Sequence, residues 1–371
     1  MTQDNIPLAL PDLLGNEEAY VCEAIKSTMI SSSGRFVRQF EQDFSSLCGC
    51  NSAIGVSNGT VALHLALLGL NVGPGDEVIV PSLTYVATAN AVKYVGAEPV
   101  FVDIDTDNWC IDPRRLALAL TSRTKGIIAV HLYGHPADMD EINKFAEEHD
   151  LWVVEDAAEA HTALYKGRPV GGLGQAATFS FYGNKILTSG EGGAVTTSDR
   201  ELESRMRLLG GQGMSLTQRY YFPVTGYNFR LSNIACAFLC AQLERADTIV
   251  KTRRRIFGWY QERLNGIPGI GLQPVCHWAT PAPWLFCITV AADHYGHDRN
   301  HLMTHLADKG IETRPFFRPL HEMPPFCDQG RKVELPVTVA VSKAGVCLPC
   351  YTTLGESSVD RITEIIKAYH S

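Results

Sequence analysis

The chain has 371 residues, of which 45% are hydrophobic and 19% are charged, and its formal net charge is −8. This length is enough for two domains and a large core. The negative balance gives no general attraction to nucleic acid or to an anionic membrane, so neither is expected as a partner. No apolar run reaches the ~18 residues of a membrane span, and the polar segment 1–5 is not typical of a signal peptide.

Eleven cysteines are scattered along the chain, an odd number with no paired spacing typical of a disulfide framework. Free thiols persist in reducing compartments, whereas disulfides accumulate in oxidising ones. The cysteine content therefore predicts free thiols and a cytoplasmic protein.

Residues 1–50 are expected to form an entry segment with helices, because apolar residues recur at helical spacing over 16–25 and 36–47. The turn between these helices is rich in hydroxyl groups and glycine, and it contains Ser31 and Ser32.

The next segment predicts a strand, a small polar turn and a helix, at 53–56, 57–60 and 61–70. Such a turn binds phosphate when the free N–H groups and positive dipole end of the helix meet the anion, and Gly59 would let the backbone approach it. The simpler interpretation of this stretch alone is a plain helix cap by Asn58 or Thr60.

Strands and helices then alternate, with strands expected at 77–80, 99–102 and within 125–134, and helices at 87–95 and 138–149. This alternation predicts a mostly parallel sheet with helices on both faces. Tyr85 follows the first of these strands, where its ring could stack on a flat cofactor or could equally belong to the core.

The most informative stretch is 151–193. It predicts a buried strand that ends next to Asp156, and a second strand that leads to Ser180 and then to Lys185. Ligands bind at the carboxyl ends of strands in open α/β sheets. Both charges could instead be ordinary solvated groups, as most charged residues are.

Two features favour a functional interpretation of this pair. An unpaired carboxylate at Asp156 would be costly between an apolar strand and a run of small residues. Lys185 lies among glycines and apolar residues, where the pKa of a lysine falls and its amine becomes a nucleophile. A nucleophilic amine and a separate carboxylate that could hold a pyridinium nitrogen are what a pyridoxal phosphate (PLP) enzyme needs.

The later part of the chain is expected to form a helix from 199, a glycine-rich loop at 210–213, and one long helix over 231–263. The intervening segment carries Arg219, Asn228 and Arg230 among aromatic residues, and it is too polar for a core and too aromatic for a linker.

We expect a large domain over 1–250 and a smaller C-terminal domain over 251–371. The smaller domain is expected to contain a strand at 283–290 and helices at 300–309 and 357–370.

Two possible metal motifs are better explained without a metal, and no metal site is predicted. Cys347 and Cys350 form a CxxC without a second pair, in an apolar run, so burial is favoured over zinc or redox use. Four histidines at near-helical spacing allow a metal by spacing alone, but a solvated helix face is the favoured interpretation: His294, His297, His301 and His305. No dinucleotide fingerprint, P-loop or HExxH motif is present.

Four segments together resemble the DegT/StrS family of PLP-dependent sugar aminotransferases: SNGTVALHLALLGLNVGPGDEVIVPSLTYVATANAV, VVEDAAEAH, TFSFYGNKILTSGEGG and GYNFRLSN. The resemblance covers nearly the whole chain. It implies an α/β fold of fold type I, like aspartate aminotransferase, with a mostly parallel central sheet and a smaller C-terminal α+β domain. It also implies a homodimer with shared active sites.

The resemblance implies roles for individual residues. Lys185 would form the Schiff base with PLP, and Asp156 would pair with the pyridine nitrogen. The other implied cofactor contacts are Gly59, Thr60 and Ser180 at the phosphate, Tyr85 on the ring, Glu159 where many members have Gln at the ring oxygen, and Asn228 and Arg230 at the partner's cofactor phosphate. The expected substrate contacts are Ser31, Ser32, Arg219 and His321.

The implied activity is transamination of a nucleotide-linked keto-sugar with L-glutamate as the amino donor, because dehydratase relatives carry His where this chain has Lys185. Segments such as ISSSGRFVRQFE and RPFFRPLHEMPPF are most similar to members that convert GDP-4-keto-6-deoxy-D-mannose to GDP-perosamine, a deoxyamino sugar of lipopolysaccharide O-antigens. Met29 and Gly211 depart from the common pattern near the expected substrate.

Three alternatives remain open at this stage. The first is the same chemistry on a dTDP- or UDP-linked keto-sugar or a cyclitol. The second is a non-catalytic PLP-binding regulator, and the third is an NAD-dependent enzyme.

Overall fold

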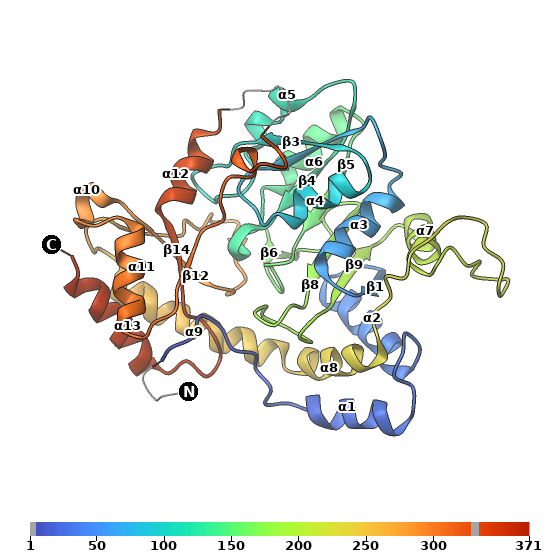
Figure 1. Ribbon diagram of the computed structural model, residues 1–371, viewed down its shortest axis with the longest axis horizontal. Helices are drawn as coiled ribbons and strands as arrows, with labels where there is room; N and C mark the ends of the chain where they lie inside the picture. The colour runs from blue at the N-terminus through green and yellow to red at the C-terminus, as the bar shows by residue number, and fades with distance from the viewer. Residues whose placement is uncertain (1–4, 328–333, 371) are drawn as a thin grey trace.

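The computed structural model describes residues 5–327 and 334–370 (Figure 1). Its helices are α1 (Glu17–Lys26), α2 (Arg35–Leu47), α3 (Gly59–Gly69), α4 (Ala87–Tyr94), α5 (Leu116–Ala119), α6 (Met139–Glu148), α7 (Arg200–Gly210), α8 (Asn233–Glu244), α9 (Ala246–Leu264), α10 (Ala292–Tyr295), α11 (Arg299–Asp308), α12 (Pro336–Ala344) and α13 (Glu356–Ala368). Its main strands are β1 (Ser52–Val56), β2 (Glu77–Pro81), β3 (Glu98–Val102), β4 (Thr124–Val130), β5 (Trp152–Asp156), β8 (Ala176–Ser180), β9 (Gly193–Thr197), β10 (Ile270–Leu272), β12 (Phe286–Val290), β13 (Arg314–Pro315) and β14 (Gly345–Leu348).

A seven-stranded sheet in the order β1-β9-β8-β5-β4-β2-β3 forms the centre of the larger part of the molecule. Strands β3, β2, β4, β5 and β8 are parallel, and β9 runs antiparallel to both of its neighbours. The mostly parallel sheet expected from the sequence is therefore confirmed. The carboxyl ends of the parallel strands meet along one edge of the sheet.

Helices cover both faces of this sheet, as the side chains at the end of β8 show. Phe179 packs edge-on against Phe44 of α2, with ring centroids 4.8 Å apart. The next residue, Ser180, lies against the first residue of α3, because a Cβ added to Gly59 would fall 2.8 Å from the Ser180 Cβ. Successive residues of a strand point to opposite faces, so α2 and α3 lie on opposite sides.

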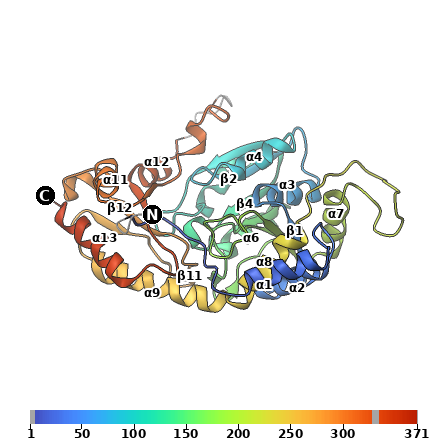
Figure 2. The same cartoon turned by 60° about the horizontal axis from the view of Figure 1, so that its bottom comes forward.

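The C-terminal part has its own sheet, in the order β10-β12-β14-β13, with α9, α11 and α12 against its strands and α13 packed on α9 and α11 (Figure 2). A second hydrophobic cluster lies here and is separate from the cluster under the large sheet. Ile6 belongs to this second cluster and forms a parallel bridge with Ile311, so this N-terminal residue packs on the C-terminal part. The boundary at 250/251 stays a prediction.

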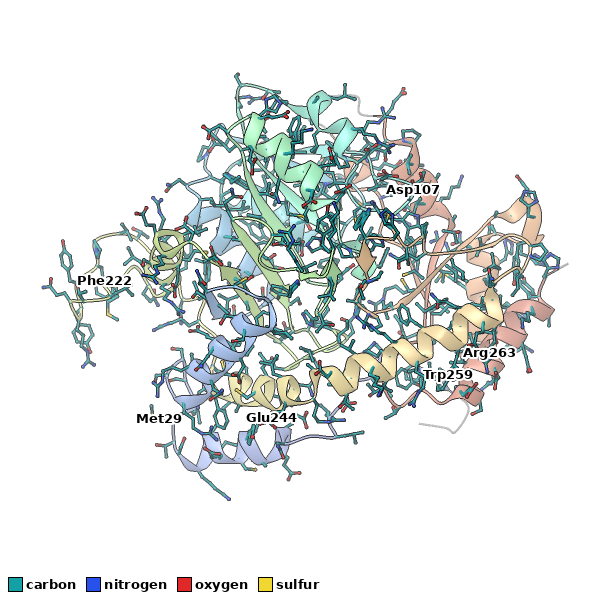
Figure 3. All side chains as sticks on the ribbon, turned by 180° about the vertical axis from the view of Figure 1, so that it is seen from behind. Met29, Asp107, Phe222, Glu244, Trp259 and Arg263 are labelled. Atoms are coloured by element: carbon teal, nitrogen blue, oxygen red, sulfur yellow. The ribbon has the colours of Figure 1, made fainter. Side chains whose placement is uncertain are left out.

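The single helix expected over 231–263 is wrong, because the structure has two helices that meet at Arg245. Arg245 has φ −112° and ψ 6°, outside the helical range, and its N–H bonds Gln242 O. Its guanidinium pairs with Asp12 of the N-terminal segment. Figure 3 shows Glu244 at the end of α8 and Trp259 on the nearly collinear α9, which leads to the small domain.

The strand expected at 283–290 begins only at Phe286. Trp284 is instead fixed by its side chain, because its indole N–H donates to Asn184 O at 2.8 Å. No helix within 5–327 and 334–370 combines the length and the hydropathy that crossing a membrane requires.

Burial of the CxxC motif is confirmed. Cys347 and Cys350 are at most 1% exposed, and all eleven cysteines are free thiols. Cys347 lies opposite Cys287 in the β12–β14 pair, with the Sγ atoms 3.8 Å apart.

The histidines expected on a solvated helix face, two of which lie in α11, are not simply solvated. Tyr369 lies between His297 and His305, with ring centroids 4.2 Å and 4.0 Å away. His301 pairs with Asp298 at 2.8 Å. These contacts hold the end of the chain against α11, and the described residues contain no group of three or more potential metal ligands.

Candidate active site

A cavity of about 650 Å³ opens at the carboxyl ends of the parallel strands. It lies beyond the ends of β2, β4, β5 and β8 and is closed on one side by residues of the small domain. The residues that line it are Asn58, Gly59, Thr60, Val61, Leu63, Thr84, Tyr85, Ala87, Val130, Asp156, Ala158, Glu159, Ser180, Tyr182, Asn184, Lys185, Glu191, Trp284, Arg314 and Phe317.

Asp156 is the last residue of β5, and the residue is 6% exposed. Its Oδ2 accepts a hydrogen bond from Thr88 Oγ1 at 2.8 Å, and its Oδ1 accepts one from the N–H of Ala158 at 3.2 Å. Burial raises the pKa of Asp156, while these two hydrogen bonds and the charge of Lys185 oppose the rise.

The neighbouring Glu155 points to the other face of the sheet and has a structural role. Its carboxylate accepts the N–H groups of Gly171, Leu173 and Gly174 at 2.7–3.0 Å. It also lies 3.0 Å from His131 Nε2. Only Asp156 of this acidic pair reaches the cavity.

Lys185 lies in the turn after β8, where its N–H bonds Tyr182 O at 2.9 Å. Its Nζ is 4.2 Å from the centre of the Trp284 ring, within range of a cation–π contact. Burial lowers the pKa of Lys185, and the charges of Glu159 and Asp156 oppose this shift. A lysine with a lowered pKa has a larger fraction of the nucleophilic neutral amine.

The first turn of α3 forms a corner of the cavity. Asn58 caps this helix, since its Oδ1 accepts from the N–H of Val61 at 2.9 Å. Gly59 allows Ser180 to approach the helix start, and Gly193 does the same for Asn58, because a Cβ there would fall 2.5 Å from the Asn58 carbonyl. The cap predicted from the sequence and a free helix N-terminus therefore occur together.

Glu159 lies one turn beyond β5 and is 6% exposed. Its Oε2 accepts from the N–H of Tyr133 at 2.8 Å. Burial raises the pKa of Glu159 to about 7, although the charge of Lys185 lowers it. This carboxyl group therefore changes its protonation state near neutral pH.

The outer wall is aromatic and cationic. Tyr85 is 58% exposed, and its ring centroid lies 5.8 Å from that of Phe317. Phe317 is held by its N–H, which donates to Tyr133 Oη at 3.1 Å. Arg314 and Lys185 are the cationic side chains among the lining residues.

Seven of the residues expected to contact a cofactor meet in this cavity: Gly59, Thr60, Tyr85, Asp156, Glu159, Ser180 and Lys185. One space thus holds an amine, a buried carboxylate, an exposed aromatic ring and a helix N-terminus that can bind an anion.

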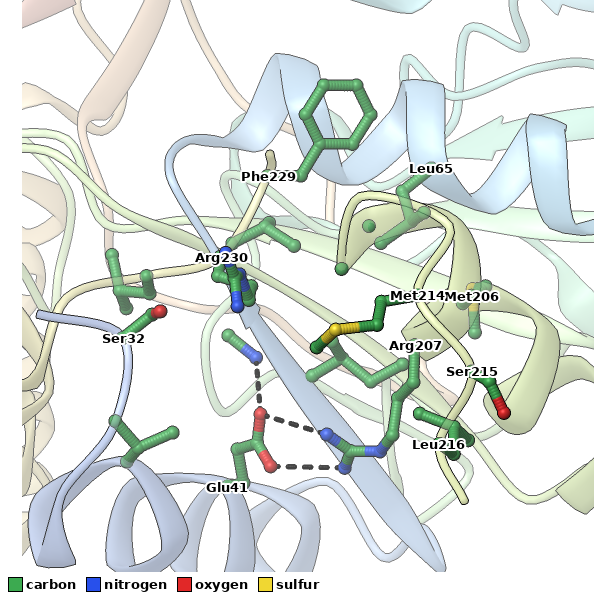
Figure 4. Close-up of a pocket in the computed structure, with 17 residues that line it drawn as sticks. Ser32, Glu41, Leu65, Met206, Arg207, Met214, Ser215, Leu216, Phe229 and Arg230 are labelled. Carbon is green, nitrogen blue, oxygen red and sulfur yellow. Dashed lines mark hydrogen bonds and ion pairs between the residues drawn. The ribbon is translucent and has the colours of Figure 1, made fainter. Parts of the chain in front are cut away.

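The remaining expected residues do not line this cavity within one chain. Arg219, Asn228 and Ser31 are exposed on the surface. Ser32 and Arg230 line a second pocket of about 350 Å³, shown in Figure 4.

The second pocket is built around an ion pair. Arg207 Nη2 lies 3.0 Å from Glu41 Oε2, and Glu41 Oε1 accepts a hydrogen bond from the N–H of Gly55 at 3.0 Å. Figure 4 shows this pair at the base and Arg230 across the opening. Arg230 contacts Asn228 Oδ1 at 3.2 Å.

His321 is also outside the cavity. Ser82 directly follows β2. The ring Nδ1 of His321 lies 2.7 Å from Ser82 Oγ, and the backbone N–H of His321 donates to the same oxygen at 3.1 Å. This contact ties the small-domain segment to the edge of the large sheet.

Sequence reasoning missed six residues that line the cavity: Thr84, Tyr182, Glu191, Trp284, Arg314 and Phe317. It also missed Thr88, which lies behind the lining and donates to Asp156. Thr84 and Thr88 flank Tyr85 after a strand end, a position that could have indicated them. Trp284, Arg314 and Phe317 come from the small domain, and no sequence pattern indicates how that domain docks.

Comparisons with known proteins agree with this geometry. Residues 11–367 match the DegT/DnrJ/EryC1/StrS aminotransferase family. The chain is 46% identical over 358 residues to a GDP-perosamine synthase of Caulobacter vibrioides, covering 96% of each chain. It is 42% identical over 366 residues to a GDP-perosamine synthase of Escherichia coli O157:H7, covering 99% of each.

Solved structures of related proteins have the same fold over nearly the whole chain. DesV of S. venezuelae is 36% identical with a TM-score of 0.90, covering 96% of this chain and 94% of that one. A putative sugar aminotransferase from Streptococcus pneumoniae is 28% identical with a TM-score of 0.92, covering 99% and 98%. The fold is the expected fold type I architecture, and this chain belongs to the DegT/DnrJ/EryC1/StrS family of sugar aminotransferases.

Proposed function

We propose that this protein transfers the amino group of L-glutamate to GDP-4-keto-6-deoxy-D-mannose and so makes GDP-perosamine, with PLP as its cofactor. The observation that supports the substrate is the similarity to relatives named GDP-perosamine synthase, at 37–46% identity over nearly the full chain. The O-antigen precursor role follows from that product.

The cavity fits PLP by the chemistry of its residues. Asp156 has a buried carboxylate to pair with the pyridine nitrogen, and Lys185 has an amine for the aldehyde. The helix N-terminus at Gly59 and Thr60, with Ser180, suits the phosphate. When bound, PLP supplies the electron sink that transamination requires.

The residues of the chain have separate tasks in this reaction. Lys185 Nζ takes a proton from Cα of L-glutamate and later delivers one to the reacting carbon of the keto-sugar. Asp156 would pair with the ring nitrogen of bound PLP and balance its positive charge. Tyr85 and Trp284, which line the cavity, would lie against the reacting groups.

We also propose a homodimer with shared active sites. The arm, residues 211–230, projects from the large domain and carries exposed aromatic side chains, including Tyr220 and Phe222 (Figure 3). Exposed apolar groups of this kind mark interaction surfaces. In the proposed dimer the arm brings Arg219, Asn228 and Arg230 to the partner's cavity. The turn between α1 and α2 brings Ser31 and Ser32.

The free thiols support a cytoplasmic location in this proposal. The expected substrate contact of His321 stays a prediction; in the structure its Nδ1 lies 2.7 Å from Ser82 Oγ.

A half-reaction tests the function. The enzyme is converted to its amine form with L-glutamate, the amino acid is removed, and nucleotide keto-sugars are added one at a time. We expect the cofactor absorbance to return rapidly with GDP-4-keto-6-deoxy-D-mannose. If the absorbance returns only with a dTDP- or UDP-linked sugar, that sugar and not the GDP-linked one is the substrate. If L-glutamate does not change the absorbance, it is not the amino donor.

A further inference from the structure

Two threonine hydroxyls connect the cavity to the buried carboxylate of Asp156. Thr84 follows β2, and Thr88 lies in the first turn of α4. Their Oγ1 atoms are 2.9 Å apart, and Thr88 Oγ1 is 2.8 Å from Asp156 Oδ2. Thr84 and Thr88 are 2% and 0% exposed, so water does not compete for these hydrogen bonds.

The direction of this chain follows from the number of protons available. An ionised Asp156 can only accept, so the single hydroxyl proton of Thr88 must point to it. The Thr88 oxygen is then free to accept, and the hydroxyl proton of Thr84 points to Thr88. The two hydroxyl dipoles therefore align toward the carboxylate, and aligned hydrogen bonds strengthen one another.

Other contacts of Asp156 are weaker or serve another purpose. The N–H of Ala158 reaches Oδ1 at 3.2 Å, which is longer than the Thr88 contact. The titratable and charged groups facing Asp156 are Lys185 after β8, His131 after β4, and Glu159 beyond β5. Lys185 is needed for its own reaction, so its charge is not constantly available to balance Asp156.

Burial works against the role proposed for Asp156. A buried carboxylate tends to take up a proton, and a neutral acid would not balance a charged pyridine nitrogen. Burial does raise the pKa of Asp156, and the Thr88 hydrogen bond is the largest of the effects that lower it. The hydroxyl pair thus counteracts the penalty that the site itself creates.

We propose that Thr88, aligned by Thr84, is a positioning residue that keeps Asp156 ionised and directed at the pyridine nitrogen of the cofactor. The identity of the group that Asp156 holds rests on the function proposed above. The hydroxyl chain itself is a property of the protein without cofactor.

Matched variants separate the hydroxyl from the packing of the side chain. Thr88→Val keeps the shape and removes the hydroxyl, whereas Thr88→Ser keeps the hydroxyl and removes a methyl group. Thr84→Val removes only the second hydroxyl. Asp156→Asn identifies the carboxyl band of Asp156 in infrared difference spectra.

Two readouts are measured on the full-length chain. The first is the infrared titration of Asp156 in cofactor-free protein, and the second is the dissociation constant of PLP. We expect Thr88→Val to raise the midpoint of the Asp156 titration by about one pH unit. We also expect it to raise the dissociation constant of PLP about tenfold. Thr88→Ser should stay within about twofold of the parent, and Thr84→Val should lie between them.

Two results would overturn the proposal. One is a Thr88→Val protein with the parent's titration and PLP affinity, and the other is a Thr88→Ser protein as impaired as Thr88→Val, which would indicate packing. The infrared titration needs no cofactor, so a parent protein that fails to bind PLP would reject the proposed function without deciding the role of Thr88.

Discussion

The buried side of the cavity, which we call the floor, consists of Asp156, Glu159 and Lys185 with the supporting Thr88. Contacts within one chain fix the positions of these residues, whereas they fix the arm, residues 211–230, much less. On the floor, Asp156 and Thr88 are at most 6% exposed and are hydrogen-bonded to each other. In the arm, Tyr220 is 73% exposed, and the Arg230 guanidinium donates to Asn228 Oδ1, two residues earlier in the same arm.

The difference shows which parts of the site are encoded within a single chain. Residues at the ends of strands are placed by the sheet, whose register is fixed by burial on both faces. The arm has few buried contacts of its own, so its functional position depends on what it packs against. The proposed chemistry therefore lies on the floor, and the proposed substrate recognition lies partly on a second chain.

The largest effect is expected from the floor. Lys185→Ala should lower turnover by about 10³-fold or more, because both the amine nucleophile and the proton carrier are lost. The variant should still bind the amine form of the cofactor. Turnover is measured with L-glutamate and the keto-sugar, and bound cofactor by absorbance.

Lys144→Ala is the matched control, since Lys144 is an exposed lysine of α6. It should keep the parent's turnover. Substantial turnover by Lys185→Ala would show that Lys185 is not the catalytic amine. The assignment of the chemistry to the floor of the cavity would then fail.

The floor was also the part that sequence could predict. The strand before Asp156 and the strand before Ser180 were expected close to where the structure has them, because short apolar runs with β-branched residues leave few alternatives. The resemblance then gave these residues their expected roles.

The rest depends on long-range docking. Arg245 breaks a pattern that is helical on both sides, and the break coincides with a pairing to Asp12, 233 residues earlier. Trp284 and Arg314 enter the cavity only because the small domain packs on the large one. No local periodicity carries that information.

A mixing experiment tests whether the arm acts in the partner's cavity. Lys185→Ala and Arg230→Ala proteins are each expected to be weakly active. If a cavity uses Lys185 of one chain and Arg230 of the other, half of the dimers in an equal mixture have one intact site. Subunit exchange should then restore about one quarter of the parent's activity, as expected for a two-fold dimer.

The control mixes two floor variants, Lys185→Ala and Asp156→Asn. Both residues line the same cavity of one chain, so no mixed dimer contains an intact site and no activity should return. Recovery in this control, or none in the first mixture, would contradict the assignment of floor and arm to different chains.

The smallest effect is expected in the stability of the cofactor-free protein. The pKa of Glu159 is raised from an ordinary 4.5 to about 7 by burial. A raised pKa means that the folded state binds the proton more tightly, so this stabilisation is complete below about 4.5 and is lost as the pH rises through about 7. The difference amounts to about 3 kcal/mol.

Glu159→Gln should remove this dependence, because the amide stays neutral and its oxygen can still accept from the N–H of Tyr133. Urea unfolding at pH 5 and pH 8 measures it, with exposed Glu148→Gln as control. The parent should lose free energy of unfolding from pH 5 to pH 8 because Glu159 becomes ionised, and Glu159→Gln should lose less over the same range. The control should lose as much as the parent. An equal pH dependence in parent and variant would mean that Glu159 is ionised at little cost, and that the floor is more hydrated than its burial indicates.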